Sequence, residues 1–437
     1  MSVITRTDVQ PILLNPRPLA RCSGSFLLLP LLPSRAPAKH VPPELWAKIL
    51  AFVFEQYNGH YKWSTERDKL KRGLLLVCKE LTAVALPLYY AHVRISTLSS
   101  LEKFTAHLQS ADQMWDSIRR IPYSTPGRWV QELDLHQLKT ILTSESYHVD
   151  ALLTQLFPLV PLLAHLTLNP TIHLSRRVIT ALSDREGIAH LRILKGIKVH
   201  ISLRTREDTF VTFLRSCNSL EELEISGQDT DLAELDSLDE SDALSLFKPL
   251  ELSRLRRLVL LSMPHSPVMF ALLHSPLPSL HHLVITPYAD TLVSNSLVPQ
   301  FIEAHGQTLT SLHLYTPQTW PSVFSPSPST LLDTCPRLYH LSLEKPLPAL
   351  TLSSSSHPLQ ILSVPRPRQE FYPVLESLLP KLPHLKSIRA RDVRWLRSGL
   401  SSRAVEAGVQ GEMMEWRRRL VRRGIQMLDS ECRDGAD

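Results

Sequence analysis

The chain has 437 residues with 48 Lys and Arg, 42 Asp and Glu, a formal net charge of +6 and only 13 Gly. This charge is too small for the length to indicate nucleic-acid binding. The glycine motifs G-x-G-x-x-G, G-x-x-x-x-G-K-[ST] and G-x-S-x-G are missing from the sequence, which argues against the enzyme classes built on them. The five Cys lie far apart and form no C-x-x-C pair, so we expect neither a disulfide framework nor a structural zinc, and a reducing compartment fits best.

Residues 1–38 are predicted to be a disordered, Pro-rich leader. They contain an apolar run from Phe26 to Leu32 that follows several arginines, a pattern that also suits a signal or transit peptide. Nowhere does the chain approach the roughly 18–20 consecutive apolar residues of a membrane-spanning helix, so we expect no membrane contact.

Residues 39–95 predict a small helical module. In its first segment apolar residues recur with helical spacing at Leu45, Ile49, Leu50 and Val53. A second helical pattern follows and ends near Pro87. Residues 96–127 are expected to be a helical linker to the next part of the chain.

Three short motifs in this module resemble the F-box: VPPEL at 41–45, the pair Ile49-Leu50, and LVCKEL at 76–81. The sequence LPLYYAHVRI at 86–95 is similar to that of fungal F-box proteins with divergent leucine-rich repeats. The resemblance implies docking on the Skp adaptor of a cullin–RING ubiquitin ligase. The positions that match the motif are Pro42, Leu45, Ile49, Leu50, Val77, Cys78 and Lys79. The alternative is a helical cap that only protects the first strand of the array that follows.

Leucine accounts for 80 of the 437 residues, and most of the later ones fall in a repeated phrase, apolar-x-x-apolar-x-apolar. The copies begin at Val130, Leu163, Ile188, Leu220, Leu255, Leu280, Leu309, Leu338, Leu359 and Leu385. Their mean spacing of about 28 residues is typical of leucine-rich repeats, which the sequence resembles over roughly 128–391. Because strand side chains alternate, the fourth and sixth residues of each phrase are expected to point into a shared core. Residues 128–395 therefore predict a solenoid of about ten repeats.

The third, fifth and seventh residues of each phrase should face the other way and line the concave side of the sheet. Concave surfaces of solenoids commonly bind partners, and the alternative is a merely solvated face. The predicted target-binding residues pass from acidic to His-rich to basic along the array: Glu132, Asp134, Glu222, Glu224, Arg257, His282, His313, His340 and Arg389.

Two further groups of residues are of types that can bind metals or act as nucleophiles. His282, His313 and His340 fall on three successive predicted strands, but no Cys or carboxylate joins them, so we predict no metal site. Cys217 and Cys335 both precede a phrase by three residues, where other repeats have apolar side chains, so we predict that they are buried.

Residues 396–437 predict a basic capping helix and tail. A helix from 403 to 428 would place Met413, Trp416 and Leu420 on one stripe. Its arginines would cover most of the remaining surface, where a nuclear-localisation or anion-binding patch is the alternative interpretation.

Together these features predict an α/β protein. A three-helix F-box-like module is followed by a leucine-rich-repeat solenoid with a parallel sheet on its concave side and helices or irregular segments on its convex side. The expected function is that of a non-catalytic substrate receptor in a Skp–cullin–F-box ubiquitin ligase, in the cytoplasm or nucleus, with a protein target and without a cofactor. The alternative is a leucine-rich-repeat scaffold with a helical cap and no ligase partner.

Overall fold

The computed structural model describes residues 41–56, 64–113, 126–139, 143–199, 208–227, 248–263, 266–287, 296–316, 327–366, 369–395 and 409–434. The predicted leader therefore lies outside the described residues. None of the helices within these ranges is long and apolar enough to cross a membrane.

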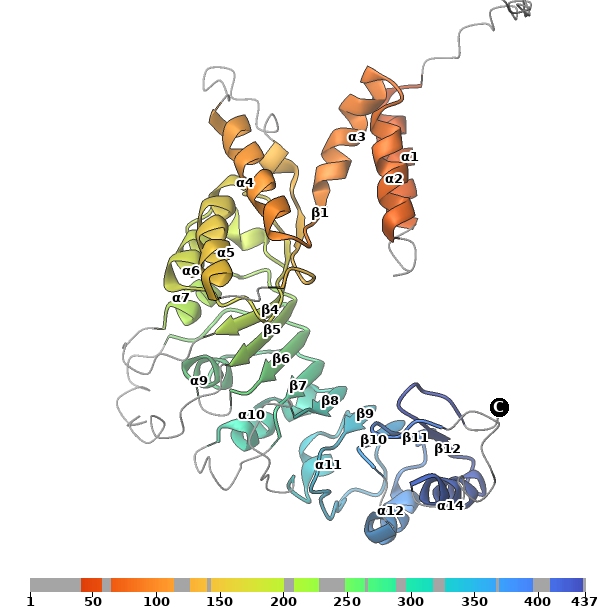
Figure 1. Ribbon diagram of the computed structural model, residues 1–437. Coiled ribbons are helices and arrows are strands. Elements are labelled where there is room, and N and C mark those ends of the chain that lie inside the picture. Colours follow the sequence, from red (N-terminus) through yellow and green to blue (C-terminus); the bar gives the residue numbers. More distant parts are fainter. Residues whose placement is uncertain are drawn as a thin grey trace, which may run out of the picture.

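Three helices form the N-terminal module: α1 (Pro43–Gln56), α2 (Ser64–Leu75) and α3 (Lys79–Ala91). Both α1 and α2 pack against α3 (Figure 1). Leu50, Phe54 and Ala85 are buried inside the module, and none of them belongs to the continuous hydrophobic core of the rest of the chain. The Nζ atom of Lys71 lies 4.9 Å from the centre of the Phe54 ring and so links α2 to α1. The module thus has a small core of its own.

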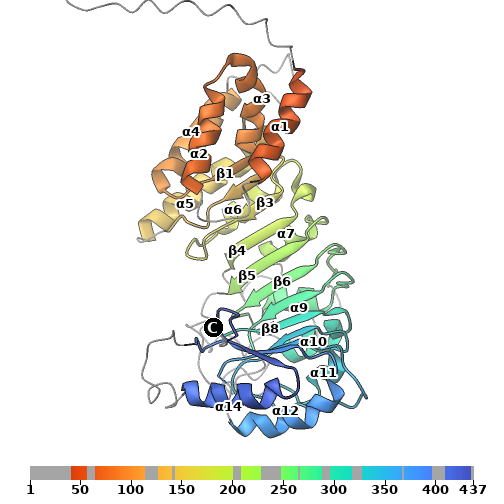
Figure 2. The same cartoon turned by 90° about the vertical axis from the view of Figure 1, so that its right-hand side faces the viewer.

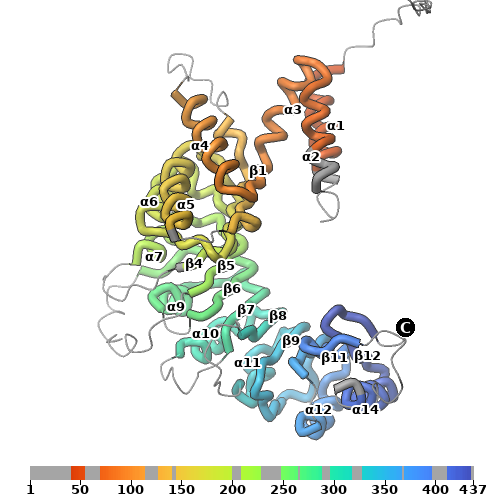
Figure 3. The backbone as a smooth tube through the Cα atoms, in the orientation of Figure 1, coloured from red at the N-terminus to blue at the C-terminus, as the bar shows by residue number. Residues whose placement is uncertain are grey.

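The rest of the described chain is organised around one parallel sheet of 12 strands in sequential order. The strands are β1 (His92–Arg94), β2 (Glu132–Asp134), β3 (His165–Thr167), β4 (Ile193–Val199), β5 (Glu222–Gly227), β6 (Arg257–Leu261), β7 (His282–Ile285), β8 (Ser311–Leu314), β9 (His340–Ser342), β10 (Ile361–Val364), β11 (Ser387–Ala390) and β12 (Gln426–Leu428). Each strand pairs with its neighbours in sequence, as the backbone trace shows (Figure 3). This arrangement confirms the predicted parallel, solenoid-like sheet.

One column of buried side chains runs through the sheet in register. From β2 to β12 its members are Leu133, Leu166, Leu194, Leu223, Leu258, Leu283, Leu312, Leu341, Leu362, Ile388 and Met427. None is more than 1% exposed. Burial of one such side chain contributes about 1.5–3 kcal/mol to stability. Each side chain in the column is covered by the one on the next strand, so neighbouring repeats depend on one another for stability.

Helices cover the apolar face of the sheet and lie on the outer side of the arc, while the strands line its inner side (Figures 1 and 2). They are α4 (Leu98–Gln113), α5 (Thr143–Leu156), α6 (Arg176–Ser183), α7 (Thr209–Arg215), α9 (Pro267–Leu273), α10 (Val298–His305), α11 (Leu331–Thr334), α12 (Tyr372–Leu378) and α14 (Val409–Val421). Ser175, Asp208 and Ser266 begin three of them, because each side chain accepts a hydrogen bond from a backbone N–H of the first turn.

One predicted phrase is wrong. The copy that begins at Ile188 places Leu191 and Ile193 in the core, whereas the register pairs Leu194, not Ile193, with Leu166. Leu191, Leu194 and Ile197 are the buried residues, and a register shift between Leu194 and Ile197 brings Ile197 beside Ile225. The extra residue is accommodated by Gly196, which has a left-handed φ of 70°.

The sheet extends beyond the predicted range 128–395 at both ends. Strand β1 follows directly from α3, and β12 follows α14. The C-terminal helix ends at Val421, earlier than the predicted position 428, because the chain turns at Gly424 with φ 73° and joins the sheet. Its stripe is confirmed, since Met413, Trp416 and Leu420 are all buried.

Candidate functional site

The N-terminal module exposes a group of apolar side chains. On α1 they are Leu45, Trp46, Ile49 and Phe52, and at the turn between α2 and α3 they are Leu76 and Val77. Leu76 is 86% exposed. The start of α1 and the α2–α3 turn lie at the same end of the module in both views (Figures 1 and 2). We call these six residues the apolar face of the module.

The structure places the predicted adaptor-binding residues in two environments. Pro42, Leu45, Ile49, Val77, Cys78 and Lys79 are exposed. Leu50 is only 3% exposed and belongs to the core of the module, so it does not lie on the exposed surface with the other six. Ile49, the preceding residue, is 48% exposed. Successive helical residues point in directions about 100° apart, and Leu50 shares the inward stripe with Phe54, four residues later.

Sequence reasoning missed Trp46 and Phe52. Leu45, Ile49 and Phe52 follow the spacing i, i+4, i+7, which is a second apolar stripe on the same helix. Of the two apolar stripes on this short helix, the one with Leu50 and Phe54 packs inside the module, and the one with Leu45, Ile49 and Phe52 remains exposed to solvent.

The turn that carries Leu76 and Val77 is held by local hydrogen bonds. The Thr82 hydroxyl donates to the Leu75 carbonyl at 2.6 Å and lies 2.8 Å from the Cys78 carbonyl. The Sγ atom of Cys78 accepts a hydrogen bond from the backbone N–H of Leu81 at 3.5 Å and caps α3. The turn is therefore fixed at the helix start rather than free to bury its apolar residues.

The module is joined to the sheet by β1 and by aromatic packing. Tyr90 of α3 packs against Trp129 of the short 3₁₀ turn η2 (Pro126–Trp129), with ring centres 5.9 Å apart. Its hydroxyl lies 3.0 Å from Nε2 of His107 on α4. Burial raises the pKa of Tyr90.

Two predicted target-binding residues instead connect β1 and β2. His92 Nδ1 lies 2.7 Å from a carboxylate oxygen of Glu132, and Arg94 Nε donates to Asp134 at 2.9 Å. The hydrogen bond with His92 holds the pKa of Glu132 below its ordinary value. The acidic start of the inner surface is thus largely paired within the chain.

The next predicted acidic residues lie on β5. Glu222 forms an ion pair with Lys195 of β4, with 2.7 Å between Nζ and Oε2, and Glu224 lies two residues further along the same strand. Lys195 is an inner-surface residue that sequence reasoning missed, because the phrase around β4 was set in the wrong register.

The three predicted histidines are only partly brought together. The rings of His313 on β8 and His340 on β9 are in edge contact, with centres 4.3 Å apart. His282 on β7 is in register with Ser311 rather than with His313. Burial, then the neighbouring His340 and Arg391, lower the pKa of His313 to about 4. Burial and the nearby Arg389 also lower the pKa of His340. Over the described ranges, no set of three His, Cys, Asp or Glu side chains is arranged to hold a metal ion.

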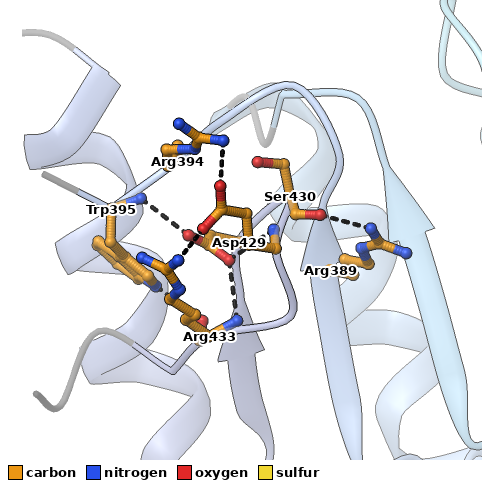
Figure 4. Close-up of polar contacts among 7 residues, drawn as sticks. Arg389, Arg394, Trp395, Asp429, Ser430 and Arg433 are labelled. Carbon is orange, nitrogen blue, oxygen red and sulfur yellow. Dashed lines mark hydrogen bonds and ion pairs between the residues drawn. The ribbon is translucent and has the colours of Figure 1, made fainter. Parts of the chain in front are cut away.

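Arg257 on β6 is exposed, and Arg389 on β11 is half-buried. The guanidinium of Arg389 donates to the Ser430 carbonyl at 2.5 Å, in the segment that follows β12 (Figure 4). That segment is organised by Asp429, whose carboxylate accepts hydrogen bonds from the backbone N–H groups of Trp395, Glu431 and Arg433. We call residues 429–434 the C-terminal hook.

The two cysteines of the array are confirmed as buried residues. Burial raises the pKa of both Cys217 and Cys335 to about 12. Both thiols are therefore protonated near neutral pH, which disfavours any role as nucleophile or metal ligand.

No protein-family model matches the chain, and no curated protein matches it. Among solved structures, the crystal structure of a protein from Bacteroides fragilis matches with a TM-score of 0.30 and 12% identity, over 76% of this chain and 72% of that chain. A similarity at this level carries no conclusion about function.

Proposed function

We propose that this protein is the substrate-recognition subunit of a Skp–cullin–F-box ubiquitin ligase. Residues 39–95 would act as a divergent F-box that docks the Skp adaptor through the apolar face of the module. The solenoid, interpreted as divergent leucine-rich repeats, would hold a target protein on its inner surface. The observation that carries the proposal is the apolar face itself, presented by a helical module with its own core.

Clustered apolar side chains in water are costly unless a partner covers them. Leu45, Ile49 and Phe52 lie on one exposed stripe of α1, and single scattered residues would need no such explanation. Polar residues border the stripe, including Glu44 and Lys48. An apolar centre with a polar rim is the usual composition of a protein–protein interface.

The proposed role requires no bond chemistry in this chain. By holding the adaptor, and through it the cullin core, at one end and the target along the sheet, the protein would raise the effective concentration of target lysines near the ubiquitin-conjugating enzyme. A cytoplasmic or nuclear location belongs to the same proposal, because the ubiquitin ligase operates there.

The test is direct binding of the purified chain to a purified Skp adaptor, measured by calorimetry. We expect wild type to bind, and the double variant Leu45→Asp, Ile49→Asp to lose at least about 3 kcal/mol of binding free energy, because central apolar contacts dominate such interfaces. Both residues are exposed, so the solenoid should retain its thermal unfolding transition.

Tyr147→Asp is the matched control. Tyr147 lies on α5 and is 74% exposed, so the variant removes a large exposed side chain and adds a charge outside the module. It should bind the adaptor like wild type. Folded wild type that fails to bind any Skp adaptor would overturn the proposal and favour a leucine-rich-repeat scaffold without a ligase partner.

A further inference from the structure

The inner surface of the sheet changes its charge between β5 and β6. Residues 257–261, 282–286, 311–315, 340–344, 361–365 and 387–391 contain a single carboxylate, that of Glu344. This carboxylate is engaged by Arg391, at 3.0 Å from Nη2. Six residues form what we call the basic inner surface: Arg257, His282, His313, His340, Arg389 and Arg391.

Arg391 is balanced by Glu344, but the charges of Arg257 and Arg389 are not balanced by a carboxylate of the described chain. Arg257 forms no ion pair there, and its in-register neighbour on β5, Glu222, is bonded to Lys195. Arg389 donates to a neutral carbonyl group, not to a carboxylate. The pKa values of His313 and His340 are lowered by burial and, in addition, by neighbouring arginines, which reflects a positive potential over these strands.

Some polar atoms near this surface form no hydrogen bond within the described ranges. The Nε atoms of Arg389 and Arg391 and the hydroxyl of Ser342 have no hydrogen-bond partner among the described residues. Ser342 lies on β9, is 1% exposed, and pairs in register with His313 on one side and Ser363 on the other. Buried donors of this kind are normally satisfied, so these three atoms mark a part of the sheet whose hydrogen bonding the described chain does not complete.

We propose that the basic inner surface binds an acidic polypeptide segment, rich in Asp and Glu, that crosses the strands from β6 to β11. This inference deepens the proposed function, because it names the class of target, and its biological role rests on that function. Carboxylates of the segment would pair with Arg257 at one end and Arg389 at the other, while Nε2 of His313 and Nε2 of His340 remain bonded to the Ser311 and Ser363 hydroxyls.

The dimensions fit a short extended peptide. Five strand spacings of about 4.8 Å separate β6 from β11, or about 24 Å along the sheet, so about seven extended residues at about 3.4 Å each are the most that the curved inner side requires. Glu224 on β5 would repel the acidic segment, and Arg94 at the β1–β2 end is already paired with Asp134, so the segment would lie toward the C-terminal half.

The test uses the full chain and a fluorescein-labelled acidic peptide of about ten Glu, Asp and Ser residues, long enough to cross the surface. Fluorescence anisotropy should show binding that weakens between about 50 and 200 mM salt, because the contacts are ionic. A peptide with Lys in place of every Asp and Glu should not bind. Equal binding of the two peptides, or tighter binding of a single-stranded oligonucleotide, would overturn the inference.

Variants locate the site. Arg257→Glu and Arg389→Gln should each weaken acidic-peptide binding by about fivefold or more. Arg389→Lys keeps the charge and should retain most of the affinity, which separates a loss of charge from a loosened C-terminal hook. Arg422→Glu is the matched control in the exposed turn after α14, where the loss should be below about twofold. Wild-type affinity in both Arg257→Glu and Arg389→Gln would refute the site.

The adaptor experiment distinguishes the two proposals. The variant Leu45→Asp, Ile49→Asp should bind the acidic peptide like wild type, because these residues lie on α1 and not on the sheet. If the wild-type chain binds the acidic peptide but no adaptor, the peptide-binding role of the basic inner surface is supported and the ligase function is rejected. If it binds an adaptor but not the peptide, the ligase function is supported and the peptide-binding role is rejected.

Discussion

The guanidinium of Arg391, which follows β11, donates to the carbonyl oxygen of Leu314 at the end of β8, at 3.2 Å. Strands β9 and β10 lie between them, and in a flat sheet this separation would be about 14 Å, beyond the reach of an arginine side chain. The same guanidinium donates to the Leu343 carbonyl at 2.7 Å. Arg391 therefore joins the ends of three strands on the inner side of a strongly curved part of the sheet.

Arg391→Met should destabilise the C-terminal repeats. The variant retains much of the apolar stem but loses the bonds to Leu314, Leu343 and Glu344, so we expect a loss of about 1.5–3 kcal/mol in the free energy of unfolding. Urea titration measures it, and hydrogen exchange should be fastest at the ends of β8 and β9. Arg418→Met, at an exposed position on α14, should change stability by less than about 0.5 kcal/mol. Equal losses in the two variants would contradict the role of Arg391 in joining the strand ends.

Lower pH should destabilise the array through its buried histidines. His357 is 2% exposed, and its Nδ1 accepts a hydrogen bond from the Leu359 N–H while Nε2 lies 3.1 Å from the Cys335 carbonyl oxygen, an arrangement that needs the neutral ring. Burial lowers the pKa of His357. The folded protein then binds fewer protons than the unfolded chain, so stability is present above about pH 6.5 and is lost as pH falls below it.

Thermal unfolding from pH 7.5 to pH 5 tests this expectation. His357→Gln should be less stable than wild type at neutral pH, because one ring partner is lost, but its transition should depend less on pH. A pH dependence identical to that of wild type would assign the acid sensitivity to other groups.

Asp429→Ala should loosen the C-terminal hook. The carboxylate is fully buried, and its three backbone N–H donors lie at 2.8–3.1 Å. Burial raises the pKa of Asp429, but these donors together with Arg433 lower it more, so the net pKa is below its ordinary value. The stabilisation is therefore present above about pH 4 and is lost as pH falls further.

Removal of the carboxylate should cost about 1–3 kcal/mol locally. Hydrogen exchange should accelerate in residues 425–434 and remain unchanged in the first half of the sheet. Asp392→Ala is the control, because among the described residues the Asp392 carboxylate forms only a long exposed ion pair of 3.9 Å with Lys345, and the variant should change stability by less than about 1 kcal/mol. Unchanged exchange in the hook of Asp429→Ala would show that the hook is held by other contacts.

Gly196→Ala should destabilise the array, whereas Gly73→Ala should not. A Cβ at Gly196 would lie 2.1 Å from the Leu168 carbonyl oxygen, and φ is 70°. The left-handed backbone alone costs about 1–2 kcal/mol for alanine, and the clash adds to it. Gly73 lies in α2 with nothing within 4 Å of an added Cβ, so alanine should stabilise its helix by about 0.5–1 kcal/mol. Equal unfolding midpoints for wild type and Gly196→Ala would contradict the expectation that this position requires glycine.

The sequence alone predicts most of the strands, because alternating burial imposes a readable pattern. From β5 to β11 the predicted inward residues, such as Leu223 and Leu312, are the buried ones. The prediction failed at β4, where Leu191, Ile193, Leu194 and Ile197 offer several competing registers. Pairing with β3 and β5 selects one of them, and the bulge at Gly196 makes it compatible with both neighbours.

The candidate surfaces depended more strongly on tertiary structure. The helical period of α1 identifies two apolar stripes, but only packing against α3 decides that Leu50 is core and that Leu45 and Ile49 remain exposed. Likewise, the residue types Glu132 and Asp134 suggest an acidic patch, and their hydrogen-bond partners His92 and Arg94 come from a three-residue strand too short to recognise by periodicity.

The sequence by itself thus determined the architecture of this protein, a parallel array built on a column of leucines, because burial repeats at a fixed local period. Tertiary structure decided which side chains on the inner surface keep an unbalanced charge and which face of the first helix stays in water. Charge pairing and helix docking join residues that are far apart in the chain, such as Arg391 and Leu314, and no local pattern specifies them.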